Sequence, residues 1–184
     1  MEIYQPAEDS LLFADLLEKE LAKLTKKDFN LKFLEVGTGS GILSKTASKF
    51  LSAKNILALD INPDAVKALQ KEKFKTIQSD LFKNIENKFD LIIFNAPYLP
   101  LDKREPKSSQ LTTTGGKRGD EISLKFLTQA KQHLNPNGKI FLLISSLTPQ
   151  DKIKKLWPHK IVARKKIFME ELLILEFKPN PNNP

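Results

Sequence analysis

The chain alternates between segments with the apolar spacing of helices and short apolar runs typical of buried strands. Helical spacing is clearest over residues 7–24, where Asp9 or Ser10 is placed to cap the helix. Further helices are predicted at 42–51, about 62–71, 120–134 and 149–157. Strands are predicted at 32–36, 55–60, 74–80, 89–94 and 139–145, and the segment 160–177 predicts two more strands joined by a tight turn.

This order of elements predicts one α/β domain over residues 1–178. Repeated strand–helix–strand units with apolar strands favour a mostly parallel sheet covered by helices on both faces. The last two strands lie close enough in sequence to form an antiparallel hairpin, which makes a seven-stranded sheet. Residues 179–184 are rich in proline and asparagine and predict a flexible tail.

One long segment, residues 99–119, is polar and shows neither the apolar spacing of a helix nor the apolar pattern of a strand. Loops of this length in compact domains are uncommon unless they serve a function. Its basic residues predict a mobile clamp for a substrate, although simple disorder fits the composition equally well. These residues are Lys103, Arg104, Lys107, Lys117 and Arg118.

Composition excludes several classes of site. The 184 residues include no cysteine, which removes disulfides, thiolate metal sites and cysteine nucleophiles. The two histidines, His133 and His159, are far apart in sequence, so no protein-bound catalytic metal is expected. The N-terminal sequence is acidic where a signal peptide is basic, and no apolar run is long enough for a bilayer. We therefore expect a cytoplasmic protein that does not contact membranes.

The net charge of +8 leaves nucleic acid open as a partner. Among the 30 basic residues only Arg104, Arg118 and Arg164 are arginine, whereas readers of nucleic acid commonly rely on the bidentate fork of arginine. A solvated lysine surface is therefore favoured over a nucleic-acid footprint.

Glycines and polar residues gather where the predicted strands end. Glycines 37, 39 and 41 follow the first strand in EVGTGSG, Asp60 ends the second, Asp80 the third and Asn95 follows the fourth. The carboxyl ends of parallel strands meet at one edge of the sheet, where ligands bind in such folds. These residues are expected to form one site.

The glycine pattern favours S-adenosylmethionine over a dinucleotide. The dinucleotide fingerprint GxGxxG fails because Ile42 occupies its last position. Asp60 is placed to accept both hydroxyls of a ribose. Glu35 would repel a pyrophosphate but suits the cationic groups of S-adenosylmethionine.

The stretch FNAPYLP, residues 94–100, carries more chemistry than a strand exit needs. The Asn95 side-chain oxygen and the Ala96 backbone carbonyl can each accept one hydrogen of a planar NH2 group on an amide or an adenine. Pro97 stiffens the backbone that aims the carbonyl, and Tyr98 can stack on a flat substrate. No activated serine, cysteine or histidine is available, so positioning should supply the catalysis. The plain alternative is a proline-stiffened loop with a buried tyrosine.

These motifs together resemble the HemK-like class I methyltransferases. The resemblance rests on PAEDS, LEVGTGSG, ALDINPDA, SDLF, FNAPYLP and GGKRGDE, in the right order through nearly the whole chain. It is strongest to the archaeal and eukaryotic branch that methylates the glutamine N5 of translation termination (release) factors with S-adenosylmethionine. It implies a single-domain, Rossmann-like fold.

The resemblance also implies residue roles. The expected cofactor-binding set is Ser10, Glu35, Gly37, Gly39, Gly41, Asp60, Ile61, Asp80, Leu81 and Asn95. The expected catalytic segment is Asn95, Ala96, Pro97 and Tyr98. Ala96 departs from the commoner Asn-Pro-Pro-Tyr of the family, but it keeps the carbonyl.

Two other functions and one partner remain open. An adenine-N6 methyltransferase acting on RNA or DNA uses the same tetrapeptide, and a non-enzymatic binding module is the third possibility. The resemblance implies a small zinc-binding activator protein on an open edge strand, 74–80, with the zinc held wholly by that partner. Phe74, Ile77 and Phe82 are expected to be exposed there, guarded by Lys73 and Lys75. A self-sufficient monomer is the alternative.

Overall fold

A computed structural model describes residues 3–28, 30–83 and 85–179 of the protein. Its centre is a seven-stranded sheet in the order β3-β2-β1-β4-β5-β7-β6. The first five strands in chain order are parallel, β7 is antiparallel to β5, and β6 is antiparallel to β7. The predicted seven strands and C-terminal hairpin are therefore confirmed. The strands are β1 (Phe33–Val36), β2 (Ile56–Asp60), β3 (Lys75–Gln78), β4 (Phe89–Asn95), β5 (Leu134–Ser145), β6 (His159–Lys166) and β7 (Glu171–Phe177).

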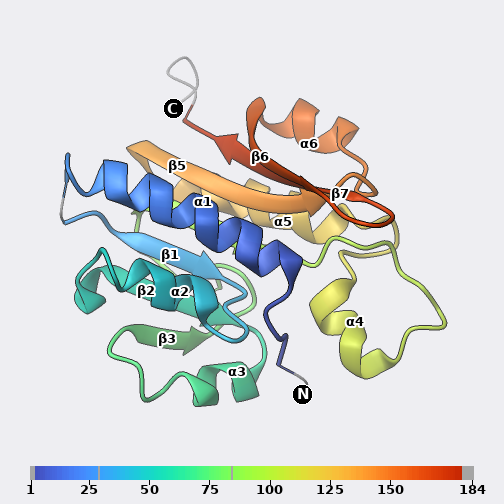
Figure 1. Ribbon diagram of the computed structural model, residues 1–184, viewed down its shortest axis with the longest axis horizontal. Helices are drawn as coiled ribbons and strands as arrows, with labels where there is room; N and C mark the ends of the chain where they lie inside the picture. Colours follow the sequence, from blue (N-terminus) through green and yellow to red (C-terminus); the bar gives the residue numbers. More distant parts are fainter. Residues whose placement is uncertain (1–2, 29, 84, 180–184) are drawn as a thin grey trace.

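Helices cover both faces of this sheet, as expected (Figure 1). Alternate residues of each strand point to opposite faces, so neighbours such as Phe33 and Leu34 enter two separate hydrophobic clusters. One cluster packs under α1 and α2, and the other under α5 and α6. The helices are α1 (Glu8–Leu24), α2 (Ile42–Ala47), α3 (Pro63–Ala68), α4 (Lys107–Thr113), α5 (Glu121–Ala130) and α6 (Asp151–Leu156), with short 3-10 turns at Ala53–Asn55 and Lys131–His133.

Some boundaries differ from the sequence prediction. Helix α1 begins at Glu8 with Ala7 as its N-cap residue, so Asp9 and Ser10 lie inside the first turn and do not cap it. Helix α5 ends at Ala130, and β5 begins at Leu134 rather than at residue 139. The extension forms because Leu134 pairs with Phe89 and the Asn135 side chain donates a 2.6 Å hydrogen bond to Asp90.

The segment 99–119 is more ordered than its composition indicates. It contains α4, and Figure 1 shows this helix standing off the sheet on the side to which the arrowhead of β1 points. The Leu99 N–H donates to Thr113 O at 2.9 Å, and the Gly115 N–H donates to Leu99 O at 2.9 Å. Because α4 and these bonds order the segment, the alternative of simple disorder does not describe it.

Strand β3 lies at one end of the sheet, as the edge-strand prediction requires. The expected exposure of the aromatic residues that flank this strand is wrong, since Phe74 and Phe82 are each only 5% exposed. The Phe82 ring stacks on His133 at a centroid distance of 4.6 Å and on Phe126 at 5.7 Å. Only Ile77 of the three apolar residues is partly exposed. The open edge therefore offers backbone groups rather than aromatic rings.

The predicted tail 179–184 falls outside the described residues except for Pro179. Within the described part of the chain, no helix combines the length and the apolar character needed to cross a lipid bilayer.

Candidate functional site

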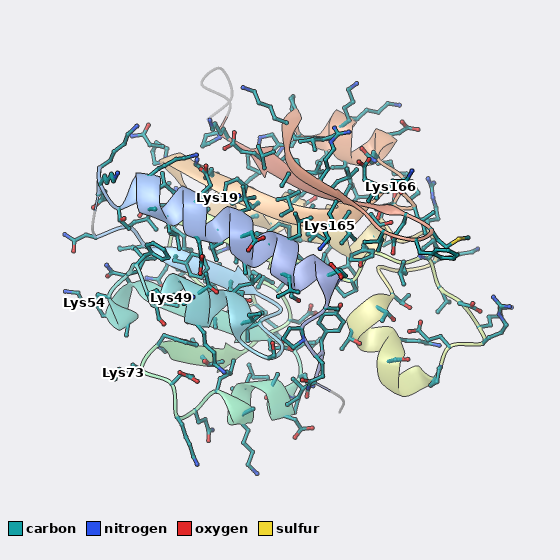
Figure 2. The ribbon with its side chains drawn as sticks, in the orientation of Figure 1. Lys19, Lys49, Lys54, Lys73, Lys165 and Lys166 are labelled. Carbon is teal, nitrogen blue, oxygen red and sulfur yellow. The ribbon has the colours of Figure 1, made fainter. Side chains whose placement is uncertain are left out.

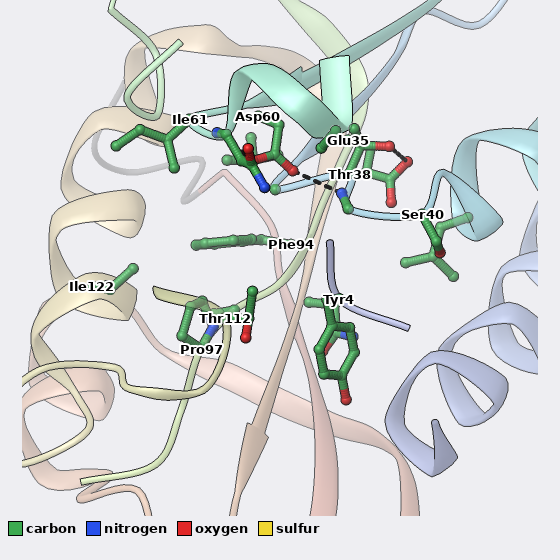
Figure 3. A pocket seen from close by; sticks show the side chains of 18 of the residues that line it. Tyr4, Glu35, Thr38, Ser40, Asp60, Ile61, Phe94, Pro97, Thr112 and Ile122 are labelled. Atoms are coloured by element: carbon green, nitrogen blue, oxygen red, sulfur yellow. Dashed lines mark hydrogen bonds between the residues drawn. The ribbon is translucent and has the colours of Figure 1, made fainter. Parts of the chain in front are cut away.

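A cavity of about 330 Å³ lies beyond the carboxyl ends of β1, β2, β3 and β4 (Figure 3). This volume is in the range of small-molecule pockets. Tyr4, the first turn of α1, the end of α4 and the start of α5 complete its wall. Twelve of the thirteen predicted site residues line the cavity: Ser10, Glu35, Gly37, Gly39, Asp60, Ile61, Asp80, Leu81, Asn95, Ala96, Pro97 and Tyr98. Gly41 alone of the predicted set does not.

The glycine turn after β1 is built from left-handed backbone. Gly37 and Gly41 have φ values of +65° and +77°, which other residues rarely adopt. A Cβ on Gly37 would come 2.8 Å from Phe94 Cε2, so the turn packs directly on that ring. A Cβ on Gly41 would come 2.5 Å from Leu69 Cδ2, next to the end of α3. Gly41 therefore lets α2 start against Leu69, which is a packing role.

Asp60 holds this turn in place from the end of β2. Its Oδ1 accepts the Asn62 N–H at 2.8 Å, and its Oδ2 accepts the Gly39 N–H at 2.7 Å. Burial raises the pKa of the Asp60 carboxyl above its ordinary value. Each oxygen keeps a further lone pair, so both remain able to accept a ligand hydroxyl.

Glu35 is buried at the inner end of the cavity, 2% exposed. Its Oε2 accepts hydrogen bonds from Thr38 Oγ1 at 2.8 Å, from the Ser44 N–H at 2.9 Å and from Ser44 Oγ. Burial raises the pKa of the Glu35 carboxyl to about 7. No hydrogen bond reaches Oε1 from any described residue, so this oxygen is available to a cationic group of a ligand.

The turn after β3 supplies Asp80 and Leu81. Leu81 has φ +51°, the one left-handed value among the described residues other than glycine. Backbone of this kind in a non-glycine residue is concentrated at functional sites. The turn is held by Ser79 Oγ, which donates to Leu81 O at 2.9 Å, and Asp80 pairs with Lys125 at 3.0 Å.

Beside and below Asp60, the wall of the cavity is largely apolar. In Figure 3, Ile61, Phe94 and Ile122 line one side of the space, and Pro97 lies below them. A flat aromatic group fits between such side chains, while its polar edge can reach the turn after β3.

Asn95 lies at the end of β4 with its amide in a defined orientation. Its Nδ2 donates to Asp9 Oδ2 at 3.0 Å, across 86 residues of sequence. Its Oδ1 is buried and has no hydrogen-bond partner among the described residues. A buried acceptor without a partner is costly, and Asn95 lines the cavity, so a ligand donor that reaches Oδ1 would satisfy it.

Two residues of this arrangement escaped the sequence prediction. The sequence predicts only a capping role for Asp9 and no role for Tyr4, whose hydroxyl donates to Asp9 Oδ2 at 2.9 Å. The only signal was that Asp9 belongs to PAEDS, the first of the motifs that carry the resemblance.

Residues 96–98 pack against the GGKRGDE motif, residues 115–121. A Cβ on Gly115 would lie 2.6 Å from Pro97 O, and one on Gly119 would lie 2.6 Å from Tyr98 O. Thr148 Oγ1 also donates to Tyr98 O at 3.1 Å. Burial, with the charges of Asp9 and Glu170, raises the pKa of the Tyr98 phenol. The phenol is therefore neutral at physiological pH and can stack on a flat group.

Comparison with known proteins finds methyltransferases that are similar to this chain. A candidate protein N5-glutamine methyltransferase of Methanocaldococcus jannaschii is 41% identical over 95% of this chain and 90% of its own length. The eRF1 methyltransferase catalytic subunit mtq2 of Schizosaccharomyces pombe is 31% identical over 77% of this chain and 72% of its own. Among solved structures, ribosomal protein L11 methylase from Lactobacillus delbrueckii subsp. bulgaricus shares the fold. Its TM-score is 0.66 at 22% identity, with 97% of this chain and 82% of that chain covered.

The family profile described as Methyltransferase small domain matches residues 14–169, which is most of the chain. The match spans the glycine turn, Asp60 and the Asn95–Tyr98 segment. The protein belongs to this methyltransferase family.

Proposed function

We propose that the protein is an S-adenosylmethionine-dependent N-methyltransferase acting on a glutamine side-chain amide of a translation termination factor in the cytosol. The observation that carries the proposal is Asn95, which lines the cavity and whose buried Oδ1 is a hydrogen-bond acceptor without a partner among the described residues. The relatives support the same reading, since one is named for N5-glutamine and another for eRF1.

The residues around the cavity fit S-adenosylmethionine. Glu35 Oε1 is placed for the ammonium group, Asp60 for the ribose hydroxyls, and the apolar side chains of Ile61 and Phe94 for the adenine. Left-handed Gly37 and Gly39 let the backbone approach the ligand closely. Bound there, S-adenosylmethionine supplies an electrophilic methyl group on its sulfonium.

The Asn95–Tyr98 segment positions the acceptor nitrogen. An amide NH2 is a weak nucleophile because its lone pair is delocalised into the carbonyl. Asn95 Oδ1 and Ala96 O each accept one of its two hydrogens, which fixes the nitrogen and directs its lone pair toward the methyl group. Transfer would break the carbon–sulfur bond of the sulfonium, with its electron pair left on the sulfur, form a carbon–nitrogen bond, and release one amide hydrogen as a proton to solvent. Holding both reactants side by side supplies most of the rate.

The N6 amine of adenine is also a planar NH2 group, so nucleic acid is the alternative acceptor. Against it, the lysines are distributed over several elements rather than gathered at the cavity. Figure 2 places Lys19 on α1, Lys73 before β3 and Lys165 on β6. Several are already paired, such as Lys49 with Glu18 at 2.8 Å.

The segment 99–119 is proposed as a clamp for the protein substrate. Thr112 and Thr113 at the end of α4 line the cavity, so the segment reaches the reacting groups. Lys103 and Arg104 are exposed on its outer part, and Lys117 and Arg118 are exposed just after its base. Charge of this kind steers the approach of an acidic surface.

An activator subunit is proposed to bind at β3. The relative from Schizosaccharomyces pombe is named a catalytic subunit, which supports a second chain. The Ser79 N–H donates to Asp60 O at 2.8 Å, and donors alternate in direction along a strand. The N–H groups of Gln78 and Thr76 therefore face the open edge, where another strand can pair. Any zinc in the complex belongs to the partner.

The decisive experiment offers labelled S-adenosylmethionine and the purified protein to four acceptors in parallel: a termination factor, the same factor with its GGQ glutamine changed to alanine, RNA and DNA. The expected result is label on the first acceptor alone, with the methyl group located on the glutamine by mass spectrometry. Label on RNA or DNA alone would replace this proposal with the adenine alternative.

A further inference from the structure

The Asn95 side-chain amide has two possible orientations that differ only in which atom meets the substrate. With Oδ1 toward the cavity, Asn95 accepts a hydrogen from the substrate amide. With the amide turned over, its own NH2 would face the NH2 of the substrate, two donors in contact. A device that selects one orientation is therefore needed for the proposed function, on which this inference rests.

Asp9 has the contacts to make that selection. It is 4% exposed, and all of its partners are donors. Oδ1 accepts the Ser10 N–H at 2.6 Å and Ser10 Oγ at 3.3 Å, while Oδ2 accepts Tyr4 OH at 2.9 Å and Asn95 Nδ2 at 3.0 Å. A carboxylate only accepts hydrogen bonds, so it can be satisfied by Nδ2 of Asn95 and not by Oδ1.

Asp9 is itself fixed from two sides. The Ser10 bond is short and comes from backbone at the first turn of α1, which packs on the sheet through Phe13 and Leu17. The Tyr4 bond comes from the segment that precedes the helix. The carboxylate cannot turn to serve another partner without giving up one of these bonds.

We propose that Asp9 is the positioning residue that locks the Asn95 amide with its oxygen toward the substrate, with Tyr4 holding Asp9. This assigns a function to the PAEDS motif beyond any contact with the cofactor. The alternative is that Asp9 merely fastens α1 to β4, and the following variants separate the two roles.

Asp9→Asn tests the selection directly, because it changes one acceptor atom into a donor at nearly constant shape. The oxygen of the introduced amide is expected to keep the short bond to the Ser10 N–H, which directs the new NH2 group at Asn95. The Asn95 amide then turns over and presents a donor to the substrate. We expect kcat on the glutamine acceptor to fall by about 100-fold, as for a misplaced reacting group, with cofactor affinity and melting temperature close to those of wild type. Asp15→Asn, on the exposed side of the same helix, is the matched control and should have no effect.

A double exchange gives the sharper test. Asp9→Asn combined with Asn95→Asp restores a matched pair, with a donor at position 9 facing an acceptor at position 95, and it leaves a carboxylate oxygen directed at the substrate. The double variant should regain at least about tenfold of the activity lost in Asp9→Asn, which coupled neighbours allow and independent losses do not. A double variant less active than both single variants would overturn the proposal.

A readout without substrate keeps this inference separate from the proposed function. In ligand-free wild type, the Asn95 side-chain NH2 faces a buried carboxylate, so its hydrogens should exchange slowly with solvent in side-chain amide NMR spectra. In Asp9→Asn the group should face the cavity and exchange rapidly, whereas Asp15→Asn should leave it protected. Equal protection in wild type and Asp9→Asn would overturn the proposal. A wild-type protein that methylates none of the four acceptors would instead refute the proposed function and leave the NMR result to stand.

Discussion

The Asp60 carboxylate accepts the Gly39 backbone N–H at 2.7 Å, and this bond joins the end of β2 to the glycine turn that follows β1. One side chain thus both shapes the turn and faces the space where a ribose is proposed to bind. A change at Asp60 should therefore affect ligand binding in two ways at once.

Asp60→Ala should weaken S-adenosylmethionine binding by about 100-fold, since hydrogen bonds to a charged group contribute roughly 1.5–3 kcal/mol each. Isothermal calorimetry measures the change. Asp15→Ala, a carboxylate removed from the surface of α1, is the control. Unchanged affinity, or tighter binding of NAD than of S-adenosylmethionine, would contradict the assignment.

Cofactor affinity should rise with pH up to about 7 and then level off. The raised pKa means that Glu35 is protonated below about pH 7 in the free protein, whereas a cationic ligand requires the carboxylate. Binding below this pH must release a proton, so affinity should fall by up to about tenfold per pH unit. Glu35→Gln should bind weakly at every pH and lose this dependence. A flat profile in wild type would rule out an ionised Glu35 as the ammonium partner.

The same group makes the ligand-free fold less stable as pH rises from 4.5 through 7. The sign follows from the folded pKa of about 7 against the ordinary value of 4.5, because in this window the folded state holds the proton and the unfolded chain does not. The melting temperature of the ligand-free protein should be measured across this pH range and compared with that of Glu35→Gln, whose side chain does not titrate. The difference between the two curves gives the contribution of Glu35.

Gly41→Ala should destabilise the fold without touching the cofactor. Both this change and Gly39→Ala carry the cost of left-handed backbone, about 1–2 kcal/mol, but only the former drives a methyl group into Leu69. At Gly39 the nearest atom is Tyr4 Cβ, at an ordinary 3.6 Å. The free energy of unfolding, measured with denaturant, should therefore be roughly 1–3 kcal/mol lower for Gly41→Ala than for Gly39→Ala. Leu69→Ala should lower the free energy of unfolding by less in the Gly41→Ala background than in wild type. If the losses from the two substitutions simply add, the two residues do not clash.

Thr76→Pro should block an activator that adds a strand to β3. Proline removes one N–H from the open edge and leaves the alternate donors toward β2 in place. Thr76→Val, which keeps the N–H, is the matched control and should bind the activator as wild type does. Size-exclusion chromatography of the two chains after co-expression measures the complex. Complex formation by Thr76→Pro equal to that of wild type would exclude pairing at this edge.

The sequence predicted the sheet well because its strands are short apolar runs separated by helical spacing, a signal carried by neighbouring residues. The strand-end site followed from the same reasoning, since parallel strands bring Glu35, Asp60 and Asn95 to one edge. What failed depends on contacts between distant segments. The burial of Phe82 depends on His133 and Phe126, the start of β5 depends on pairing with β4, and the role of Asp9 depends on a residue 86 positions away.

The hydrogen bonds that join Leu99 to Thr113 and Gly115 close the segment between them into a loop at its base. Its ends are already fixed, so a longer outer part changes only the entropy of closing the loop, by about 0.6 kcal/mol for each doubling of length. Residues near Lys103 and Arg104 can therefore be exchanged or extended while the Asn95–Tyr98 segment keeps its geometry. For the clamp that we propose, the choice of protein substrate would then diverge in the outer part of the loop independently of the chemistry at its base.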